Sequence, residues 1–394
     1  MLIILPLLFS LASSTIITKR STNVTERDTV AMYWGQYTSD STLYSLDSYC
    51  ETGDVDIILL SFLSSFPNDI KFSFPCDTVD GTQHYFGNSS LANCTAGKIS
   101  QDIYKCQTLG TKVFLSLGGE SGSYGFNSSA QAKEFGTKLW YMFGEYNSTL
   151  AEKYNMSTVD RPFGYNITID GFDFDIESKN NTKYYVDMAK QLKTHMDEAS
   201  NDYYIGAAPQ CVYPDKSLND LLTKAHVDYC FIQFYNNECN LDTDLFNWAT
   251  WEKFAREKSY NNDIQLFLGL PGSSNASSTG YISNVTLVEN TVETILKNDS
   301  DTRFSGVMLW DAAHAFSSEI DYDNSTITYG QAIKDMLQKV HEFEEEEGNS
   351  MSTSATGFVQ GGHSSRSKND VHHNTVPFSW ATAALVGFLS TFLL

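Results

Sequence analysis

The sequence predicts an α/β protein with the architecture of a (β/α)8 barrel of the TIM type, and three observations lead to this fold class. Eight short apolar runs occur between roughly residues 28 and 340, each nearly continuous, as expected for parallel strands covered on both faces. Longer polar or helix-like stretches separate the runs, as in a barrel of alternating strands and helices. No GxGxxG follows the first run, so the phosphate-binding signature of the competing architecture, a doubly wound open sheet, is missing.

The eight runs are the predicted barrel strands, in chain order. They are TVAMYWG at 29–35, VDIILLSFL at 55–63, TKVFLSLGG at 111–119, ITIDGFDFDIE at 167–177, YYIGAAPQ at 203–210, VDYCFIQFYN at 227–236, IQLFLGLPG at 264–272 and FSGVMLWDA at 304–312. Between them, the segments 181–199 and 286–299 place apolar residues at three- and four-residue spacings and therefore predict helices. A single barrel domain is expected over residues 21–340, with long loops and a C-terminal tail.

Two connections are longer than the barrel itself requires. Residues 64–111 carry three cysteines, and residues 120–166 carry several glycosylation sequons and many Gly, Tyr and Phe residues. Insertions of this size are expected on the loop face of a barrel, where they wall a cleft.

The net charge restricts the partners of the chain. The chain has 26 Lys and Arg against 48 Asp and Glu, a formal charge of −22. Such an acidic surface repels phosphate backbones, so no nucleic-acid partner is expected. A neutral polysaccharide is indifferent to this charge.

Both ends of the sequence carry apolar runs. The first 14 residues, MLIILPLLFSLASS, are too short for a bilayer and end in small residues, which predicts a signal peptide within residues 1–20. Lys19-Arg20 is either a second processing point or a solvated pair. Residues 341–376 are acidic and then Ser/Gly-rich, which predicts a disordered spacer, and residues 377–394 form an uncharged apolar tail.

Small residues, a polar stretch and an apolar tail follow one another in the order of a GPI-anchor signal. The alternative is a C-terminal transmembrane helix, which lacks cytoplasmic Lys or Arg after the apolar stretch. We therefore expect a secreted protein held at the plasma membrane or cell wall, with membrane contact through the lipid only.

Sequons and cysteines support the secretory route. Seven cysteines fit an oxidising compartment, with six able to pair and one left over. The twelve predicted N-glycosylation sites are Asn23, Asn88, Asn93, Asn127, Asn147, Asn155, Asn166, Asn180, Asn275, Asn284, Asn298 and Asn324.

The most informative segment is DGFDFDIE at 170–177. Side chains alternate along a strand, so Asp173, Asp175 and Glu177 share one face and the intervening apolar residues share the other. In a barrel the carboxylates point inward, and Glu177 lies at the C-terminal mouth, where barrel active sites form. Coupling between like charges keeps at least one proton on the group near neutral pH, the condition that a glycosidase general acid requires.

Two other interpretations of this segment stay open on the residues alone. A hydrated acidic strand end conflicts with the Phe-x-Phe alternation, which requires burial on both sides. A divalent-metal site built from carboxylate oxygens lacks a nearby His or a second acidic cluster to complete its ligands.

The DGFDFDIE string resembles the DxxDxDxE signature of glycoside hydrolase family 18, and SLGG at 116–119 resembles its SxGG motif. Further matching strings follow in order, namely AMYWGQ at 31–36, AAPQC at 207–211, QFYNN at 233–237 and VMLWD at 307–311. Over about residues 28–340 the chain is similar to the plant and fungal class III, or hevamine-like, chitinases. This resemblance implies a monomeric endochitinase acting with retention on chitin or chitooligosaccharides, in cell-wall remodelling, with no cofactor and no metal.

The resemblance also implies the catalytic roles. Glu177 would protonate the leaving oxygen and then activate water as a base. Asp175 would orient the 2-acetamido group of the substrate, whose carbonyl oxygen attacks the anomeric carbon, so the protein supplies no covalent nucleophile. Asp173 would hold the proton balance of Asp175. Tyr235 would donate a hydrogen bond to the acetamido oxygen, and Gln233 would help to position the sugar.

The same resemblance implies substrate contacts around these groups. Trp310 would form the apolar floor under the sugar at the cleavage point. Further expected contacts are Tyr33, Gln36, Phe62, Gly118 and Gly119. For Trp310, Tyr33, Gln36 and Phe62 the alternative is a role in the barrel core or rim.

Three disulfides are implied as well, each expected to tie loops near the cleft: Cys50–Cys106, Cys76–Cys94 and Cys211–Cys239. Cys230, inside an apolar run, is then expected to be an inert buried thiol. Glu120 departs from the family pattern by adding a carboxylate beside the mouth.

Two alternatives to a chitinase stay open within the same fold. One is a catalytically weak, chitin-binding or wall-anchored lectin-like protein, and the other is an enzyme that cuts the chitobiose core of N-glycans. Relatives of the lectin-like kind commonly lose the last Glu of the signature. The presence of Glu177, Asp175 and Tyr235 therefore favours catalysis.

Overall fold

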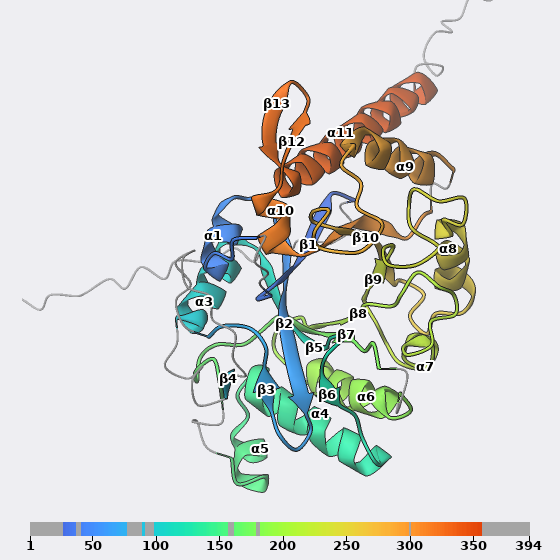
Figure 1. The fold of residues 1–394 in the computed structure, drawn as a ribbon. Helices are drawn as coiled ribbons and strands as arrows, with labels where there is room; N and C mark the ends of the chain where they lie inside the picture. The colour runs from blue at the N-terminus through green and yellow to red at the C-terminus, as the bar shows by residue number, and fades with distance from the viewer. Residues whose placement is uncertain are drawn as a thin grey trace, which may run out of the picture. The chain divides into compact units, whose positions relative to one another are not determined.

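A computed structural model of the chain describes residues 27–36, 41–76, 89–90, 98–156, 161–178, 182–298 and 301–356. Eight parallel strands close into a barrel, because β1 pairs with both β2 and β11 (Figure 1). In order around the barrel they are β1 (Thr29–Trp34), β2 (Ile57–Phe66), β5 (Lys112–Gly118), β7 (Gly171–Asp175), β8 (Tyr204–Ala207), β9 (Tyr229–Gln233), β10 (Gln265–Pro271) and β11 (Phe304–Trp310). Each of the eight predicted runs forms one of these strands, so the predicted fold class is confirmed.

Helices surround the strands (Figure 1). They are α1 (Leu46–Glu51), α3 (Ile99–Leu109), α4 (Ser129–Phe143), α5 (Ser148–Lys153), α6 (Tyr185–Asp197), α7 (Asn219–Lys224), α8 (Trp248–Glu257), α9 (Val285–Asn298), α10 (Ala312–Ser317) and α11 (Tyr329–Thr356). Helices α6 and α9 occupy the two segments whose periodicity predicted helices. The remaining strands are short: β3 (Lys71–Phe72), β4 (Ser89–Ser90), β6 (Ser123–Tyr124), β12 (Glu319–Tyr322) and β13 (Ser325–Thr328).

Buried apolar side chains form two layers, one between the strands and the helices and one inside the barrel. The larger layer lies between strands and helices and includes Phe172, Phe174 and Ile176 of the β7 segment. The smaller layer fills the interior with side chains of the other strand faces, such as Phe231 and Phe267. The apolar residues around β7 thus pack outward, and the intervening acidic residues take the opposite, inward face.

Both long connections begin at the C-terminal mouth of the barrel, where β3 and β6 pair with the end of β2. In the first connection, β3 stays at this mouth and pairs antiparallel with β2. The second connection is divided by α4, which runs back along the barrel, so residues 144–170 lead into the start of β7 at the N-terminal end. The prediction that the 120–166 insertion belongs to the loop face is wrong for this part, because a helix forms inside the expected loop.

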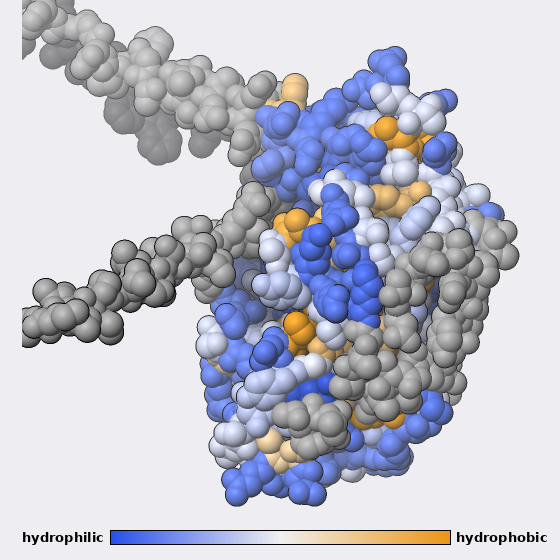
Figure 2. All heavy atoms as spheres, turned by 90° about the vertical axis from the view of Figure 1, so that its left-hand side faces the viewer, coloured by the Kyte–Doolittle hydropathy of each residue, from blue (hydrophilic) through white to orange (hydrophobic). Residues whose placement is uncertain are grey.

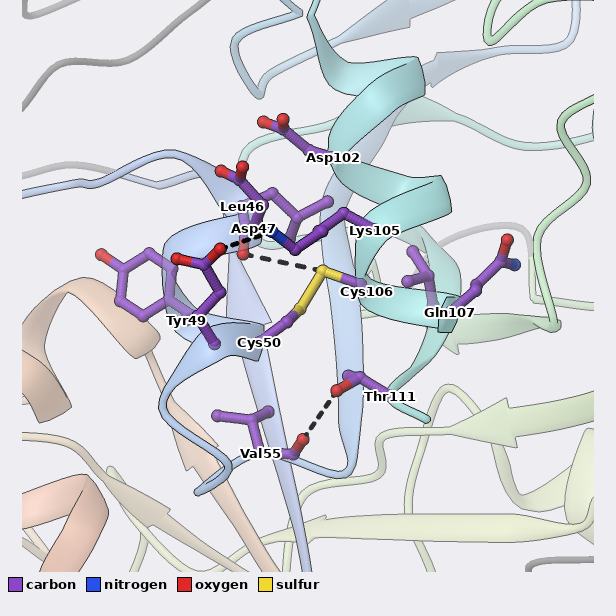
Figure 3. Close-up of a disulfide and its surroundings, with 12 residues drawn as sticks. Leu46, Asp47, Tyr49, Cys50, Val55, Asp102, Lys105, Cys106, Gln107 and Thr111 are labelled. Atoms are coloured by element: carbon purple, nitrogen blue, oxygen red, sulfur yellow. Dashed lines mark hydrogen bonds and ion pairs between the residues drawn. A yellow bond between two sulfur atoms is a disulfide. The ribbon is translucent and has the colours of Figure 1, made fainter. Parts of the chain in front are cut away.

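Two disulfides occur in the described residues, and both are among the predicted pairs. Cys50–Cys106 joins α1 to α3, with the Cys106 Sγ atom 3.7 Å from the Leu46 carbonyl oxygen (Figure 3). This bridge links two helices and no cleft loop, so the expected position is wrong for it. Cys211–Cys239 links the segments that follow β8 and β9, close to the mouth.

The remaining predicted cysteines and sequon asparagines fall partly inside and partly outside the residues that the structure describes. Cys230 is free and buried in β9. Cys94 lies outside the described residues, as do Asn23, Asn88, Asn93 and Asn180. The eight sequon asparagines that the structure describes are all exposed: Asn127, Asn147, Asn155, Asn166, Asn275, Asn284, Asn298 and Asn324.

The face that carries α1 and α3 is mostly hydrophilic (Figure 2).

The chain divides into residues 1–346, which contain the barrel, and residues 347–394. Helix α11 continues to Thr356, so residues 341–356 are helical where a disordered spacer was expected. The run of glutamates after Phe343 explains the difference, because glutamate is a good helix former. Residues 1–26 and 377–394 lie outside the described ranges; within those ranges, no helix is both long and apolar enough to cross a bilayer.

Candidate active site

A cavity of about 510 Å³ opens at the C-terminal mouth of the barrel. Of the eleven residues that the sequence predicted for catalysis and substrate contact, nine line it: Gln36, Phe62, Gly118, Gly119, Asp175, Glu177, Gln233, Tyr235 and Trp310. The other two, Asp173 and Tyr33, are buried deeper in the barrel. Residues from six of the eight strands or their exits therefore meet at one place.

Asp173 lies in the barrel interior with no exposed surface. Its Oδ2 atom accepts hydrogen bonds from Ser116 Oγ at 2.6 Å and from the Tyr33 hydroxyl at 3.0 Å, whereas its Oδ1 atom has no partner. Burial raises the pKa of Asp173 to about 6, although both hydrogen bonds act to lower it. Tyr33 is 1% exposed, so it supports Asp173 from below and has the barrel-core role that the sequence left open.

Asp175 is the last residue of β7 and is almost fully buried. The Gln233 side-chain amide donates a hydrogen bond to its Oδ1 atom at 3.1 Å. Burial, and then the negative charges of Glu177 and Asp173, raise the pKa of Asp175 well above its ordinary value. The row of carboxylates therefore keeps protons that isolated aspartates would lose.

Glu177 lies two residues beyond the end of β7 and lines the cavity. Its backbone N–H donates to the Tyr124 hydroxyl at 3.2 Å, which fixes the strand exit. Burial, with repulsion from the carboxylates of Glu120 and Asp215, raises the pKa of Glu177 to about 7. A substantial fraction of this carboxyl group is consequently protonated near neutral pH, as general acid catalysis requires.

A chain of side-chain amides runs toward Asp175. Asn237 Nδ2 donates to Gln210 Oε1 at 2.5 Å, and Gln210 Nε2 donates to Gln233 Oε1 at 2.9 Å. Gln233 then donates to Asp175, so the chain delivers an N–H to the carboxylate and fixes the Gln233 amide. Gln210 Nε2 also lies 3.5 Å from Glu177 Oε2. Sequence reasoning missed Gln210 and Asn237, although the AAPQC and QFYNN strings contain them.

Aromatic side chains form one wall of the cavity. Trp310 is partly exposed and stacks on Phe62 with ring centroids 5.8 Å apart, while Tyr33 meets its edge at 5.4 Å. Tyr235 lines the same cavity, and burial raises the pKa of its hydroxyl well above the usual value. Tyr235 therefore stays a hydrogen-bond donor at physiological pH.

Gly118 and Gly119 bring backbone close to the acidic strand. Their φ values are 115° and 81°, in the region that favours glycine. A Cβ on Gly118 would collide with the Asp175 carbonyl oxygen, and one on Gly119 would lie 2.8 Å from the Phe62 ring. The Gly119 N–H donates to the Asp175 carbonyl at 2.8 Å. These glycines thus fix the acidic strand against β5, a backbone role beside the predicted contact with substrate.

A second hollow of about 400 Å³ adjoins the first. Glu120, Glu177, Gln210 and Asn236 border both cavities. The Glu177 carboxyl group therefore borders two adjoining spaces. Among the described residues, no group of three or more His, Cys, Asp or Glu side chains is arranged to hold a metal ion.

Comparison with known proteins agrees with this geometry. The family model for glycosyl hydrolases family 18 matches residues 29–388. The chain belongs to this family. Among solved structures, the ICChI chitinase from Ipomoea carnea superimposes with a TM-score of 0.60 at 29% identity, covering 78% of this chain and 99% of that one. The xylanase and α-amylase inhibitor XAIP-II from Scadoxus multiflorus gives a TM-score of 0.55 at 25% identity, covering 79% and 97%.

Two fungal proteins are more similar in sequence. The chain is 44% identical to an endochitinase of Saccharomyces cerevisiae over 310 residues, which are 78% of this chain and 50% of that protein. It is 40% identical to chitinase 3 of Candida albicans over 324 residues, 82% of this chain and 53% of that one. The chain thus spans about half the length of these curated relatives.

Proposed function

We propose that this chain is an endochitinase that hydrolyses β-1,4-linked N-acetylglucosamine in chitin or chitooligosaccharides, with retention at the anomeric carbon. The observation that carries the proposal is the inward row of Asp173, Asp175 and Glu177, which ends at the cavity with a carboxyl group whose pKa is about 7. The endochitinase and chitinase names of the fungal relatives support the choice of substrate.

Cleavage proceeds in two steps. Glu177 gives its proton to the glycosidic oxygen while the carbonyl oxygen of the substrate's 2-acetamido group bonds to the anomeric carbon, and the bond to the leaving sugar breaks. Glu177 then takes a proton from water, whose oxygen attacks the same carbon and opens the cyclic intermediate. Two inversions at one carbon give net retention, without a covalent bond to the protein.

The groups around Glu177 serve the acetamido group and the sugar ring. Asp175, held by Gln233, accepts the acetamido N–H and stabilises the positive charge that develops on the cyclic intermediate. Asp173 has an unpartnered Oδ1 atom with which to share the proton balance of Asp175. The Tyr235 hydroxyl donates to the acetamido oxygen. Trp310 offers its partly exposed ring as the floor under the sugar.

The anomeric form of the first product tests the proposal. Wild-type protein is mixed with chitotetraose, and the anomeric protons are followed by NMR before mutarotation. We expect the β-anomer to appear first. Binding without cleavage would favour the lectin-like alternative and overturn the proposal. Release of glycans from glycoproteins, with chitotetraose left intact, would instead favour action on the N-glycan core.

We further propose that the protein acts at the cell surface as a GPI-anchored monomer that remodels a chitin-containing wall. The apolar runs 1–14 and 377–394 and the twelve sequons support this location. Phosphatidylinositol-specific phospholipase C should release the protein from intact cells in a form that sediments as a monomer. Release only by detergent would favour a transmembrane tail and contradict the anchor.

A further inference from the structure

Three sequons in one connection share a feature that the other described sequons lack, which is a tyrosine directly before the asparagine. They read YNST at 146–149, YNMS at 154–157 and YNIT at 165–168. All three fall in residues 144–170, between α4 and β7, at the N-terminal end of the barrel. The catalytic proposal gives this connection no role.

A buried arginine holds the connection in shape. Arg161 has no exposed surface, and its guanidinium group donates to the carbonyl oxygens of Tyr141, of Gly144 at 2.8 Å and of Ile167 at 3.2 Å. These carbonyls belong to the two ends of the connection. Arg161 therefore ties the end of α4 to the backbone at Ile167.

Two of the sequons are brought together by ring contact. The Tyr146 and Tyr165 rings have centroids 4.6 Å apart, yet 38% and 48% of their respective surfaces are exposed. Asn147 and Asn166, each next to one of these rings, are both exposed. An exposed aromatic pair offers an apolar face that is available for contact with a ligand.

The direction of Asn147 is also fixed. Its Oδ1 atom caps α5 by accepting hydrogen bonds from the N–H groups of Thr149 at 3.0 Å and Leu150 at 3.1 Å. The planar carboxamide then turns Nδ2, the atom that carries an N-linked glycan, away from the helix end. A glycan on Asn147 leaves the cap intact, because Oδ1 remains an acceptor.

We propose that the surface around Tyr146 and Tyr165 forms a glycan-bearing platform, in which the innermost N-acetylglucosamine of glycans on Asn147 and Asn166 packs on the Tyr146–Tyr165 pair. In the modification, an oligosaccharide moves from a lipid-linked diphosphate donor to Nδ2. The Nδ2–C1 bond forms, the bond from C1 to the diphosphate oxygen breaks, and the amide loses a proton. Attachment one residue away gives the sugar a high effective concentration over the rings, which favours the chain's own glycan over a free oligosaccharide.

Hydroxyl-radical footprinting of the secreted full chain tests the platform. The double variant Thr149→Ala/Asn166→Gln removes both sequons and keeps the Asn147 cap, whereas Thr149→Ser keeps its sequon as the matched control. We expect Tyr146 and Tyr165 to be oxidised several-fold more slowly in wild type and in Thr149→Ser than in the double variant. Tyr104 and Tyr260, 65% and 59% exposed and followed by no sequon, should react equally in all three proteins.

Three results would overturn the platform: unoccupied Asn147 and Asn166 in glycopeptide maps, occupied sites with tyrosines as reactive as in the double variant, or protection only after soluble chitooligosaccharide is added. The footprint is read without substrate, and Glu177 lies at the opposite end of the barrel. Its outcome is therefore independent of whether the chain cleaves chitin.

Discussion

The two ends of the β7 segment hold carboxyl groups in opposite surroundings. Asp170, just before β7, accepts hydrogen bonds from the Val113 N–H at 2.7 Å and from Gln107 Nε2 at 2.9 Å. Glu177, just after it, has the Gln210 amide at 3.5 Å and two carboxylates, Glu120 and Asp215, that repel its charge.

Burial raises the pKa of both groups, but the neighbours act with opposite sign. The donors of Asp170 and the positive charge of Lys112 lower its pKa, whereas nearby carboxylates raise that of Glu177 further. The first and last acidic residues of one DxxDxDxE string therefore have different roles. Asp170 ties β5 and α3 to the start of β7, and Glu177 keeps a proton available at the cavity.

Glu177→Gln tests the catalytic end and has the largest expected effect. We expect kcat on chitotetraose to fall by about 10²-fold or more, because glutamine has no proton to give. Folding should persist. A raised carboxyl pKa means that the folded state binds the proton more tightly, so wild type loses stability relative to Glu177→Gln as pH rises from the ordinary glutamate pKa of about 4.3 to about 7. Kinetic assays and thermal melts from acidic to alkaline pH measure both effects, and unchanged turnover in the folded variant would overturn the assignment.

Tyr235→Phe tests the hydroxyl that remains a donor next to this carboxyl group. We expect kcat to fall by about 10- to 10²-fold, since one hydrogen bond to the reacting acetamido oxygen is lost while the ring still fills its place. Steady-state kinetics with chitotetraose separate kcat from KM. A rise in KM alone would mean that Tyr235 binds the sugar without assisting the reaction.

Asp170→Ala tests the other end of the comparison. Loss of the carboxylate leaves the Val113 N–H without its acceptor, so we expect the free energy of unfolding to drop by about 1–3 kcal/mol. Turnover per folded molecule should stay within about twofold of wild type, because the cavity is not touched. Denaturant titration and assays at matched folded concentration measure these effects, with Asp170→Asn, which keeps one acceptor oxygen, as the control. A collapse of turnover in stable Asp170→Ala would remove the distinction between the two ends.

Glu120→Gln makes the smallest change, by removing one of the charges that set Glu177 apart from Asp170. A general acid is active when protonated, so the raised pKa of Glu177 extends activity to higher pH. Without the Glu120 charge, the alkaline limb of the profile of kcat/KM against pH should move to lower pH, and the effect should shrink in high salt. Glu134→Gln, on helix α4, is the matched control. Identical profiles for Glu120→Gln and wild type would show that Glu120 does not act on Glu177.

Much of the barrel could be predicted because buried parallel strands have a strong local signal. The alternation around Phe172 and Phe174 also assigned the two faces of β7. The position of residues 144–170 could not be read in this way, since it depends on where α4 ends, and the Ser129–Phe143 stretch was hidden inside a segment taken for a loop. Sequence separation likewise did not reveal that Cys50 and Cys106 both lie on helices.

Site residues could be predicted where they belong to a sequence motif. They could not be predicted where their role comes only from contacts between segments far apart in the sequence. Tyr124 is an example, because its hydroxyl donates to the Gly119 carbonyl at 2.6 Å and accepts from the Glu177 N–H, yet no motif includes it. The Gln210 amide lay in a matching string, but its contact with Gln233 depends on the pairing of neighbouring strands. Non-proline cis peptide bonds at Ser61–Phe62 and Trp310–Asp311 leave no sequence signal either.

The charge state of Glu177 is the property on which the proposed catalysis depends most directly. It can be measured by titrating the carboxyl carbons of protein labelled with ¹³C-glutamate, with Glu177→Gln used to assign the signal. We predict a transition with a pKa of about 7. A Glu177 signal that titrates at the ordinary glutamate value of about 4.3 would mean that this group is ionised at neutral pH and cannot act as the proton donor.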